Sequence, residues 1–214
     1  KTRASVARER GLEPLSVYIM LQNMNAEPEK EAEKFVDAEK EIPDVAAALQ
    51  GAMDIIAEDI SDDAALRKML RELYFRKGTI ASKAADEEAE SVYTNYYDYS
   101  EPVNKIAGHR VLALDRGEKE DFLKVSVAVA GDEAEKLVCD KYVKNQSAAA
   151  GYVKLAAEDG FKRLIAPSIE REIRAELTAN AAEQAIKVFS SNLRQLLMQP
   201  PVKDCVTLGL DPGY

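Results

Sequence analysis

The chain has 214 residues with 29 Lys and Arg against 38 Asp and Glu, a formal net charge of −9, and an apolar fraction of 46%. This composition is typical of a folded soluble protein and excludes a disordered tail. The sequence holds neither an apolar run of roughly 18 residues, which a membrane span requires, nor a signal-type segment. We therefore expect a cytoplasmic protein without membrane contact, and an internal fragment because the sequence begins without Met.

Cysteine and histidine are too few to build a metal centre. Cys139 and Cys205 lie far apart without a Cys or His at metal-ligand spacing, and His109 is the single histidine. The phosphate-loop, nucleophile-elbow, zinc-protease and dinucleotide motifs of large enzyme classes are absent as well. The sequence thus predicts no catalytic residue, no metal and no cofactor, and His109 is expected to be structural.

Charge is unevenly distributed along the chain. Residues 1–100 carry 13 basic and 21 acidic side chains, a net charge of −8, whereas residues 101–214 have a net charge of −1. Neutralising phosphates requires clustered Lys and Arg, so an acidic total does not favour nucleic acid as a partner. Any nucleic-acid site must therefore be local.

Residues 1–100 predict a helical region. Pro14 and Pro28 open expected helices over about 15–21 and 27–37. From Pro43 the apolar residues recur three and four apart, which predicts an amphipathic helix that ends at Ser61. We expect Ser61 to cap a second helix, 62–77, that stops at Gly78. The pair, over 43–78, has the plan of a helix-turn-helix.

The second helix of this pair carries candidate nucleic-acid contacts. Arg67, Lys68 and Arg71 share one sector of its surface, away from the apolar residues of the same helix. That sector would face phosphates while the apolar side packs. The alternative is an ordinary solvated face, in which these cations pair with neighbouring carboxylates such as Asp59 or Asp63.

Residues 101–131 predict a small β-hairpin. Between His109 and Val129, a short apolar run is followed by a polar stretch over 116–120 and by a segment in which apolar residues alternate. The preceding stretch contains four tyrosines, which suit either base stacking or a packed connector, and we favour the connector. These tyrosines are Tyr93, Tyr96, Tyr97 and Tyr99.

Residues 132–204 predict a second helical region. Its longest element runs from Ser168 to about Gln199 without an internal Gly or Pro, and we expect other helices to pack along it. Residues 205–210 are β-type and lead into a turn at Asp211. The fold class is therefore mainly α: a multi-helix N-terminal and central region with a helix-turn-helix-like pair, one small hairpin and a long helix near the C-terminus.

Several blocks of the sequence resemble the Tex family of bacterial transcription accessory proteins. The blocks at the C-terminal end are PSIEREIRAELT at 167–178, NLRQLLMQPP at 192–201 and LGLDPG at 208–213. Further blocks, TRA with ARERGLEPL, ALQGA with DIIAE, and HRVLAL with RGE, follow the order of that family. The resemblance covers nearly the whole chain.

The resemblance implies a position inside a larger protein. Members of the family combine an N-terminal helical region, an RNase H-like domain of the kind named YqgF, a helix-hairpin-helix region and an RNA-binding OB-fold. Residues 205–214 would then begin the RNase H-like domain, and Asp211 matches the first acid of its pattern. The partners implied are RNA or DNA, bound through the full-length protein, and the transcription machinery.

We interpret the chain as the helical scaffold of a nucleic-acid-associated transcription accessory protein, and not as an enzyme. If the chain binds nucleic acid itself, we expect the contacts at Arg67, Lys68, Arg71, Arg171 and Arg174. A protein-interaction scaffold would instead present an exposed apolar groove along a helix. A metal-dependent nuclease would need acids that this chain lacks, so Asp211 is read as a turn residue.

Overall fold

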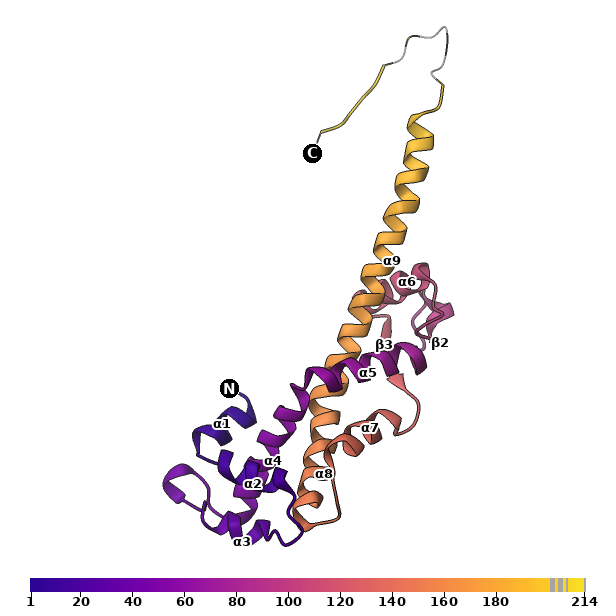
Figure 1. Ribbon diagram of the computed structural model, residues 1–214. Helices are drawn as coiled ribbons and strands as arrows, with labels where there is room; N and C mark the ends of the chain where they lie inside the picture. The colour runs from indigo at the N-terminus through magenta and orange to yellow at the C-terminus, as the bar shows by residue number, and fades with distance from the viewer. Residues whose placement is uncertain (201–202, 204–205, 207, 214) are drawn as a thin grey trace.

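The computed structural model describes residues 1–200, 203, 206 and 208–213. The fold is mainly α, as expected, with a small three-stranded antiparallel sheet and a long helix near the C-terminus. Figure 1 shows the N-terminal helices at one end of the molecule and the long helix running past the sheet and beyond it. In the part of the chain that the structure describes, no helix is both long and apolar enough to span a membrane.

The N-terminal helices gather around α4 (Val45–Ser61). They are α1 (Arg3–Glu9), α2 (Glu13–Leu21) and α3 (Pro28–Glu33), followed by the short 3₁₀ helix η1 (Ala38–Lys40). Asp44 caps α4 because its carboxylate accepts a hydrogen bond from the Ala47 N–H at 2.7 Å. The apolar side of α4 is buried as its periodicity predicts, with Ile55, Ile56 and Ile60 at most 1% exposed.

The second helix of the predicted pair, α5 (Ala64–Lys77), begins later than expected because another residue caps it. The Asp63 carboxylate accepts from the N–H groups of Ala65 and Leu66 at 2.8 and 3.1 Å. Ser61 is instead the last residue of α4, and its hydroxyl donates to the Glu58 carbonyl. The predicted end of α5 at Lys77 is confirmed.

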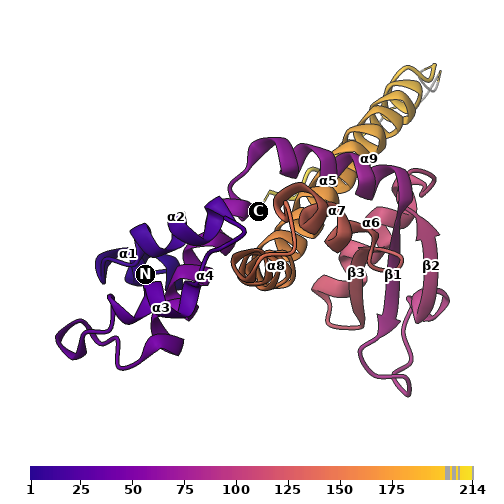
Figure 2. The ribbon, with the colours of Figure 1, turned by 60° about the horizontal axis from the view of Figure 1, so that its bottom comes forward.

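The sheet consists of β1 (Gly78–Ala84), β2 (Asp98–Pro102) and β3 (Leu123–Val129) in the order β2-β1-β3. Gly78 joins α5 directly to β1, and a Cβ at this position would lie 2.2 Å from the Tyr74 carbonyl oxygen. Ile80 pairs with Val127 of β3 on one side and with Glu101 of β2 on the other. Figure 2 shows the three strands side by side, at the end of the molecule opposite α1 to α3.

The predicted hairpin over 109–129 is wrong in its first half. Residues Gly108–Lys119 form the helix α6, and β3 pairs with β1 instead. Val111, Leu114 and Gly117 recur every three residues and face the core, so the short apolar run belongs to a helix. Gly117 allows close packing, because a Cβ there would lie 2.5 Å from a methyl group of Leu123.

The long helix is confirmed and is longer than predicted. After α7 (Glu133–Tyr142), the helix α8 (Ala148–Gly160) continues through the π-helical turn η3 (Phe161–Ile165) into α9 (Ala166–Leu197). Pro167, which directly precedes the expected helix start at Ser168, lies just after this π-helical turn, whose wider backbone accommodates a residue that lacks an N–H.

The expectation that other helices pack along this element holds for its first half only. Ile169, Ile173 and Ala181 of α9 are buried, whereas every residue from 183 to 197 is exposed. Figure 1 shows this exposed part projecting beyond the sheet. The strand predicted over 205–210 falls partly outside the described residues, and the described residues 208–210 have no regular secondary structure.

Candidate nucleic-acid interface

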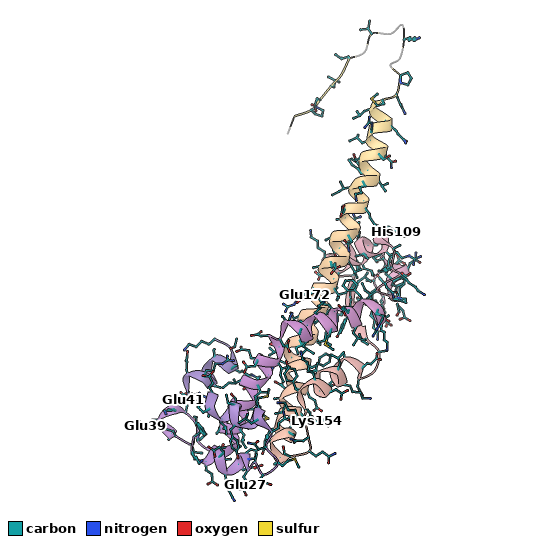
Figure 3. The ribbon with its side chains drawn as sticks, in the orientation of Figure 1. Glu27, Glu39, Glu41, His109, Lys154 and Glu172 are labelled. Atoms are coloured by element: carbon teal, nitrogen blue, oxygen red, sulfur yellow. The ribbon has the colours of Figure 1, made fainter. Side chains whose placement is uncertain are left out.

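Two of the sequence-predicted basic residues, Arg67 and Arg71, contact Glu172, which lies where α5 crosses α9 (Figure 3). The Arg67 guanidinium donates to the Ser168 hydroxyl of α9 at 2.6 Å and forms an ion pair with the Glu172 carboxylate. It also donates to the Ser61 carbonyl at 3.1 Å, at the end of α4. A single arginine therefore connects three helices.

Arg71, one turn further along α5, donates to the other oxygen of the same carboxylate at 3.0 Å. Burial opposes ionisation of Glu172, but hydrogen bonds from Arg71 and Arg67 outweigh it and lower the pKa of the carboxyl. Two cations thus share one anion at the crossing.

The partner of these two arginines differs from the carboxylates expected. Asp59 pairs with Arg8 of α1, and Asp63 pairs with Lys141 of α7. Neighbours in sequence are therefore not the partners, and the basic sector of α5 packs on α9 instead of facing solvent as a whole. That Arg67 and Arg71 contact phosphate remains a prediction, and any such contact competes with Glu172.

Lys68 and Arg171 are placed differently. Both are exposed, and neither forms an ion pair with another residue of the described chain. Lys68 directly follows Arg67 on α5, and Arg171 directly precedes Glu172 on α9, with its Nε donating to the Pro167 carbonyl at 3.1 Å. These two side chains leave their charges available to an external anion beside the crossing.

Arg174 is part of the internal packing. Its guanidinium pairs with Glu118 of α6 and, at 3.2 Å, with Asp115, and its side chain is 21% exposed. Burial disfavours the charged form, but Glu118 and Asp115 outweigh it, so the pKa of Arg174 is raised. Contact of Arg174 with nucleic acid would require these pairs to break.

The tyrosine-rich stretch is a packed connector, as favoured above. Tyr93 is 5% exposed and donates its hydroxyl hydrogen bond to Glu120 at 2.9 Å. Tyr96 and Tyr99 pack edge to face with ring centroids 5.3 Å apart, and both lie against the core.

Residues with metal-binding or nucleophilic side chains remain dispersed. Among the described residues, no three His, Cys, Asp or Glu side chains are grouped as metal ligands would be. Cys139 is half-buried on α7, and burial raises the pKa of its thiol. His109 and Asp211 are exposed, while Cys205 lies outside the described residues.

The chain is similar to known proteins over most of its length. Residues 23–189 match the family described as Tex central region-like. YdcI, an uncharacterised protein of Bacillus subtilis, is 45% identical over 218 residues, which cover 100% of this chain and 30% of that protein. The transcriptional accessory protein Tex of Neisseria gonorrhoeae is 31% identical over 229 residues, which cover 100% of this chain and 29% of Tex.

A eukaryotic relative shares a shorter region. The S1 RNA-binding domain-containing protein 1 of Pongo abelii is 30% identical over 180 residues, covering 77% of this chain and 18% of that protein. The fold and these matches define a central helical region of a transcription accessory protein family. The chain belongs to the Tex central region-like family, and it spans less than a third of the length of these relatives.

Proposed function

We propose that this chain is the non-catalytic helical scaffold of a cytoplasmic, nucleic-acid-associated transcription accessory protein. The observation behind the proposal is the crossing of α5 and α9. There Arg67 and Arg71 of α5 form ion pairs with Glu172 of α9, and these contacts join the pair α4 and α5 to the long helix. Because both guanidinium groups pair with a carboxylate of the helix packed against them, they favour a role in joining helices over a role in binding phosphate.

The nucleic acid of the full-length protein, RNA or DNA, contacts this scaffold at Lys68 and Arg171. Exposure and the absence of an ion pair within the described chain support these two residues over Arg67, Arg71 and Arg174. Two phosphate contacts give a shallow salt dependence, a slope of about −1.8 in log K against log salt for duplex DNA. The transcription machinery is the candidate protein partner.

The test is a fluorescence-anisotropy titration of the chain with labelled single-stranded RNA and duplex DNA across a series of salt concentrations. Replacing Lys68 and Arg171 together by Gln is expected to remove most of the slope, because each lost contact removes about one unit. The matched control replaces Lys105 and Lys119 by Gln. Both are exposed cations outside the crossing, so this variant is expected to leave the salt slope unchanged.

Two results would contradict the proposal. A slope that survives in the Lys68→Gln and Arg171→Gln variant would move the interface elsewhere. A wild-type slope near −4 or steeper would indicate a broad phosphate-binding surface.

A further inference from the structure

The outer half of α9 carries an apolar surface that is separate from its buried side. An apolar row follows alternate steps of four and three residues, the repeat of a helix face that packs on another element. Its members are Ala175, Ala179, Ala182, Ile186, Phe189, Leu193 and Leu196. We name its four large members, Ile186, Phe189, Leu193 and Leu196, the outer stripe.

The outer stripe is open to solvent in the described part of the chain. Ile186 and Phe189 are each 67% exposed, and Leu196 is 61% exposed. Large, contiguous exposed apolar surfaces mark interaction sites, whereas scattered single apolar residues do not. The stripe lies on the part of α9 that projects beyond the sheet in Figure 1.

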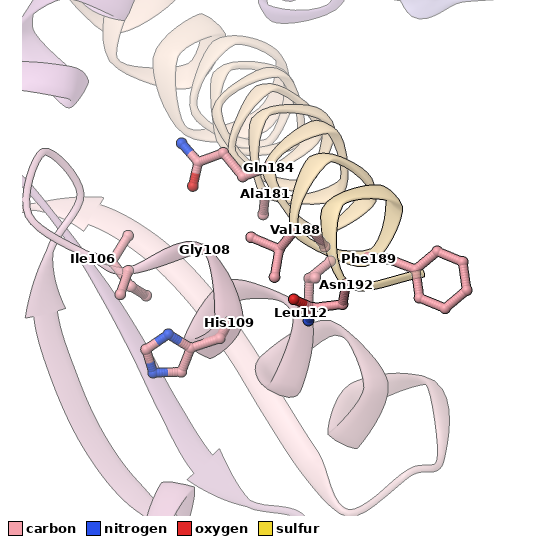
Figure 4. A pocket seen from close by; sticks show the side chains of 11 residues that line it. Ile106, Gly108, His109, Leu112, Ala181, Gln184, Val188, Phe189 and Asn192 are labelled. Carbon is pink, nitrogen blue, oxygen red and sulfur yellow. The ribbon is translucent and has the colours of Figure 1, made fainter. Parts of the chain in front are cut away.

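A groove adds a second apolar surface to the same helix. It has a volume of about 680 Å³ and lies between α9 and the start of α6, lined mainly by apolar residues including Ile106, Leu112 and Val188. At one end of the groove, Gly108 allows α6 to approach α9 closely, since a Cβ at this position would lie 3.3 Å from the Ala181 Cβ. Phe189 belongs to the outer stripe and also lines the groove, and Figure 4 shows its ring pointing away from His109 and Ile106, so groove and stripe adjoin at this residue.

The width of this surface indicates the kind of partner. At 100° per residue, the arc from Val188 to Ile186 spans roughly half of the helix circumference, wider than the narrow seam that two paired helices share. Within residues 184–197 the charged side chains are Lys187 and Arg194 alone, and Lys187 pairs with Glu183 at 2.7 Å. Such a surface fits a folded domain that wraps the helix better than one helix of a second copy.

The lengths of the relatives indicate where such a domain comes from. This chain aligns over its whole length with YdcI of Bacillus subtilis yet covers 30% of that protein. Most of each relative is therefore additional polypeptide, and tethering gives an attached domain an effective concentration in the millimolar range. We propose that the outer stripe and the groove are the docking surface for a folded domain of the same polypeptide, outside these 214 residues. This inference rests on the scaffold role proposed above.

The experiment compares the 214-residue chain with a full-length chimera, in which this sequence replaces the matching region of the Bacillus subtilis relative. Hydrogen exchange is measured by mass spectrometry for peptides that cover residues 186–197. We expect exchange at least about tenfold slower in the chimera, because docking buries the helix and suppresses local opening.

A triple substitution, Ile186→Gln with Phe189→Gln and Leu193→Gln, tests the side chains themselves. In the 214-residue chain it should leave the melting temperature unchanged, because the three side chains are exposed and Gln is a good helix former. In the chimera it should abolish the added protection and lower the melting temperature. The control is Leu155→Gln on α8, where the side chain is 54% exposed but lies outside the stripe.

Equal exchange rates in the two proteins would overturn the proposal. So would concentration-dependent dimers of the chain that protect residues 186–197, because the occupant would then be a second copy. If the chimera does not fold, the same substitutions at the aligned positions of the Bacillus subtilis relative give the second measurement. Nucleic-acid affinity is not the readout, so failure here is distinct from failure of the phosphate contacts at Lys68 and Arg171.

Discussion

The Glu170 carboxylate of α9 accepts a hydrogen bond from the backbone N–H of Val127 at 2.9 Å. Val127 belongs to β3, an edge strand of the sheet. The backbone N–H of Val125, which also points away from β1, donates a hydrogen bond to the Glu118 carboxylate of α6 at 3.2 Å. Unpaired edge groups recruit further strands and promote aggregation. Side chains of two helices therefore close this edge in place of a fourth strand.

Replacing Glu170 by Ala is expected to destabilise the chain by about 1–2 kcal/mol, because the Val127 N–H then loses its partner in a partly buried place. Urea unfolding followed by circular dichroism measures the change. Glu176→Ala, an exposed site on the same helix, is the control and should cost less than about 0.5 kcal/mol. Equal costs at the two positions would show that the edge contact contributes nothing.

Gly160 and Gly151 of α8 form a matched pair for helix packing. A Cβ at Gly160 would lie 3.0 Å from the Ala57 carbonyl oxygen of α4, whereas a Cβ at Gly151 meets nothing within 4 Å. Gly160→Ala should therefore destabilise the chain by about 1 kcal/mol or more despite the better helix propensity of Ala. Gly151→Ala should stabilise it by about 0.5–1 kcal/mol. Thermal unfolding decides, and a stabilising Gly160→Ala would refute the close packing of α4 on α8.

Asp63 makes the stability of the chain depend on pH. Hydrogen bonds from Lys141 and Tyr142, together with those from the start of α5, hold the pKa of its carboxyl well below the usual range. The stabilisation is therefore complete above about pH 4, the unfolded value, and is lost as the pH falls further towards the folded value.

Asp63→Asn should accordingly cost about 1 kcal/mol or more at pH 7 and progressively less below pH 4. Urea unfolding at a series of pH values measures the difference between wild type and variant. If the difference in unfolding free energy between wild type and Asp63→Asn stays constant down to pH 2.5, the carboxylate of Asp63 is not the source of the pH dependence.

Asp211 is exposed, and the described residues around it, 208–213, have no regular secondary structure. We predict that millimolar magnesium or manganese neither binds there nor supports cleavage of RNA or DNA by the purified chain. Gel analysis of labelled substrates and a metal titration monitored by NMR test the two parts. Metal-dependent cleavage that disappears in Asp211→Asn would establish the chain as part of a nuclease.

Local signals in the sequence predicted the elements that local interactions determine. The apolar periodicity of α4, the stop at Gly78 and the unbroken run to Leu197 are all confirmed. The sheet was missed because β1 pairs with β3 residues that lie 39 to 51 positions away in the sequence, and because β1 consists largely of small and polar side chains. A four-residue apolar run such as 111–114 does not separate a strand from a helix.

The arrangement of the candidate interface could not be predicted from the sequence, because its contacts also join residues that are far apart in the chain. The four candidate arginines were identified by type and position, but Glu172 lies about a hundred residues from Arg67 and Arg71. Periodicity reveals which side of α5 is basic, while the opposing helix depends on the tertiary fold. That Lys68 and Arg171 are exposed can be stated only when the crossing of α5 and α9 is known.

The helical path from α8 through η3 into α9 is unbroken, so a small change of angle near its base would produce a large displacement at its far end. The 32 residues of α9 extend roughly 48 Å at the helical rise, with the π-helical turn η3 at their base. A tilt of about 10° at that turn displaces the far end by roughly 8 Å, a geometric consequence of the helical rise. Whatever is attached near Leu197 would therefore move by several ångströms if α9, together with the elements packed on its first half, tilted by this small angle.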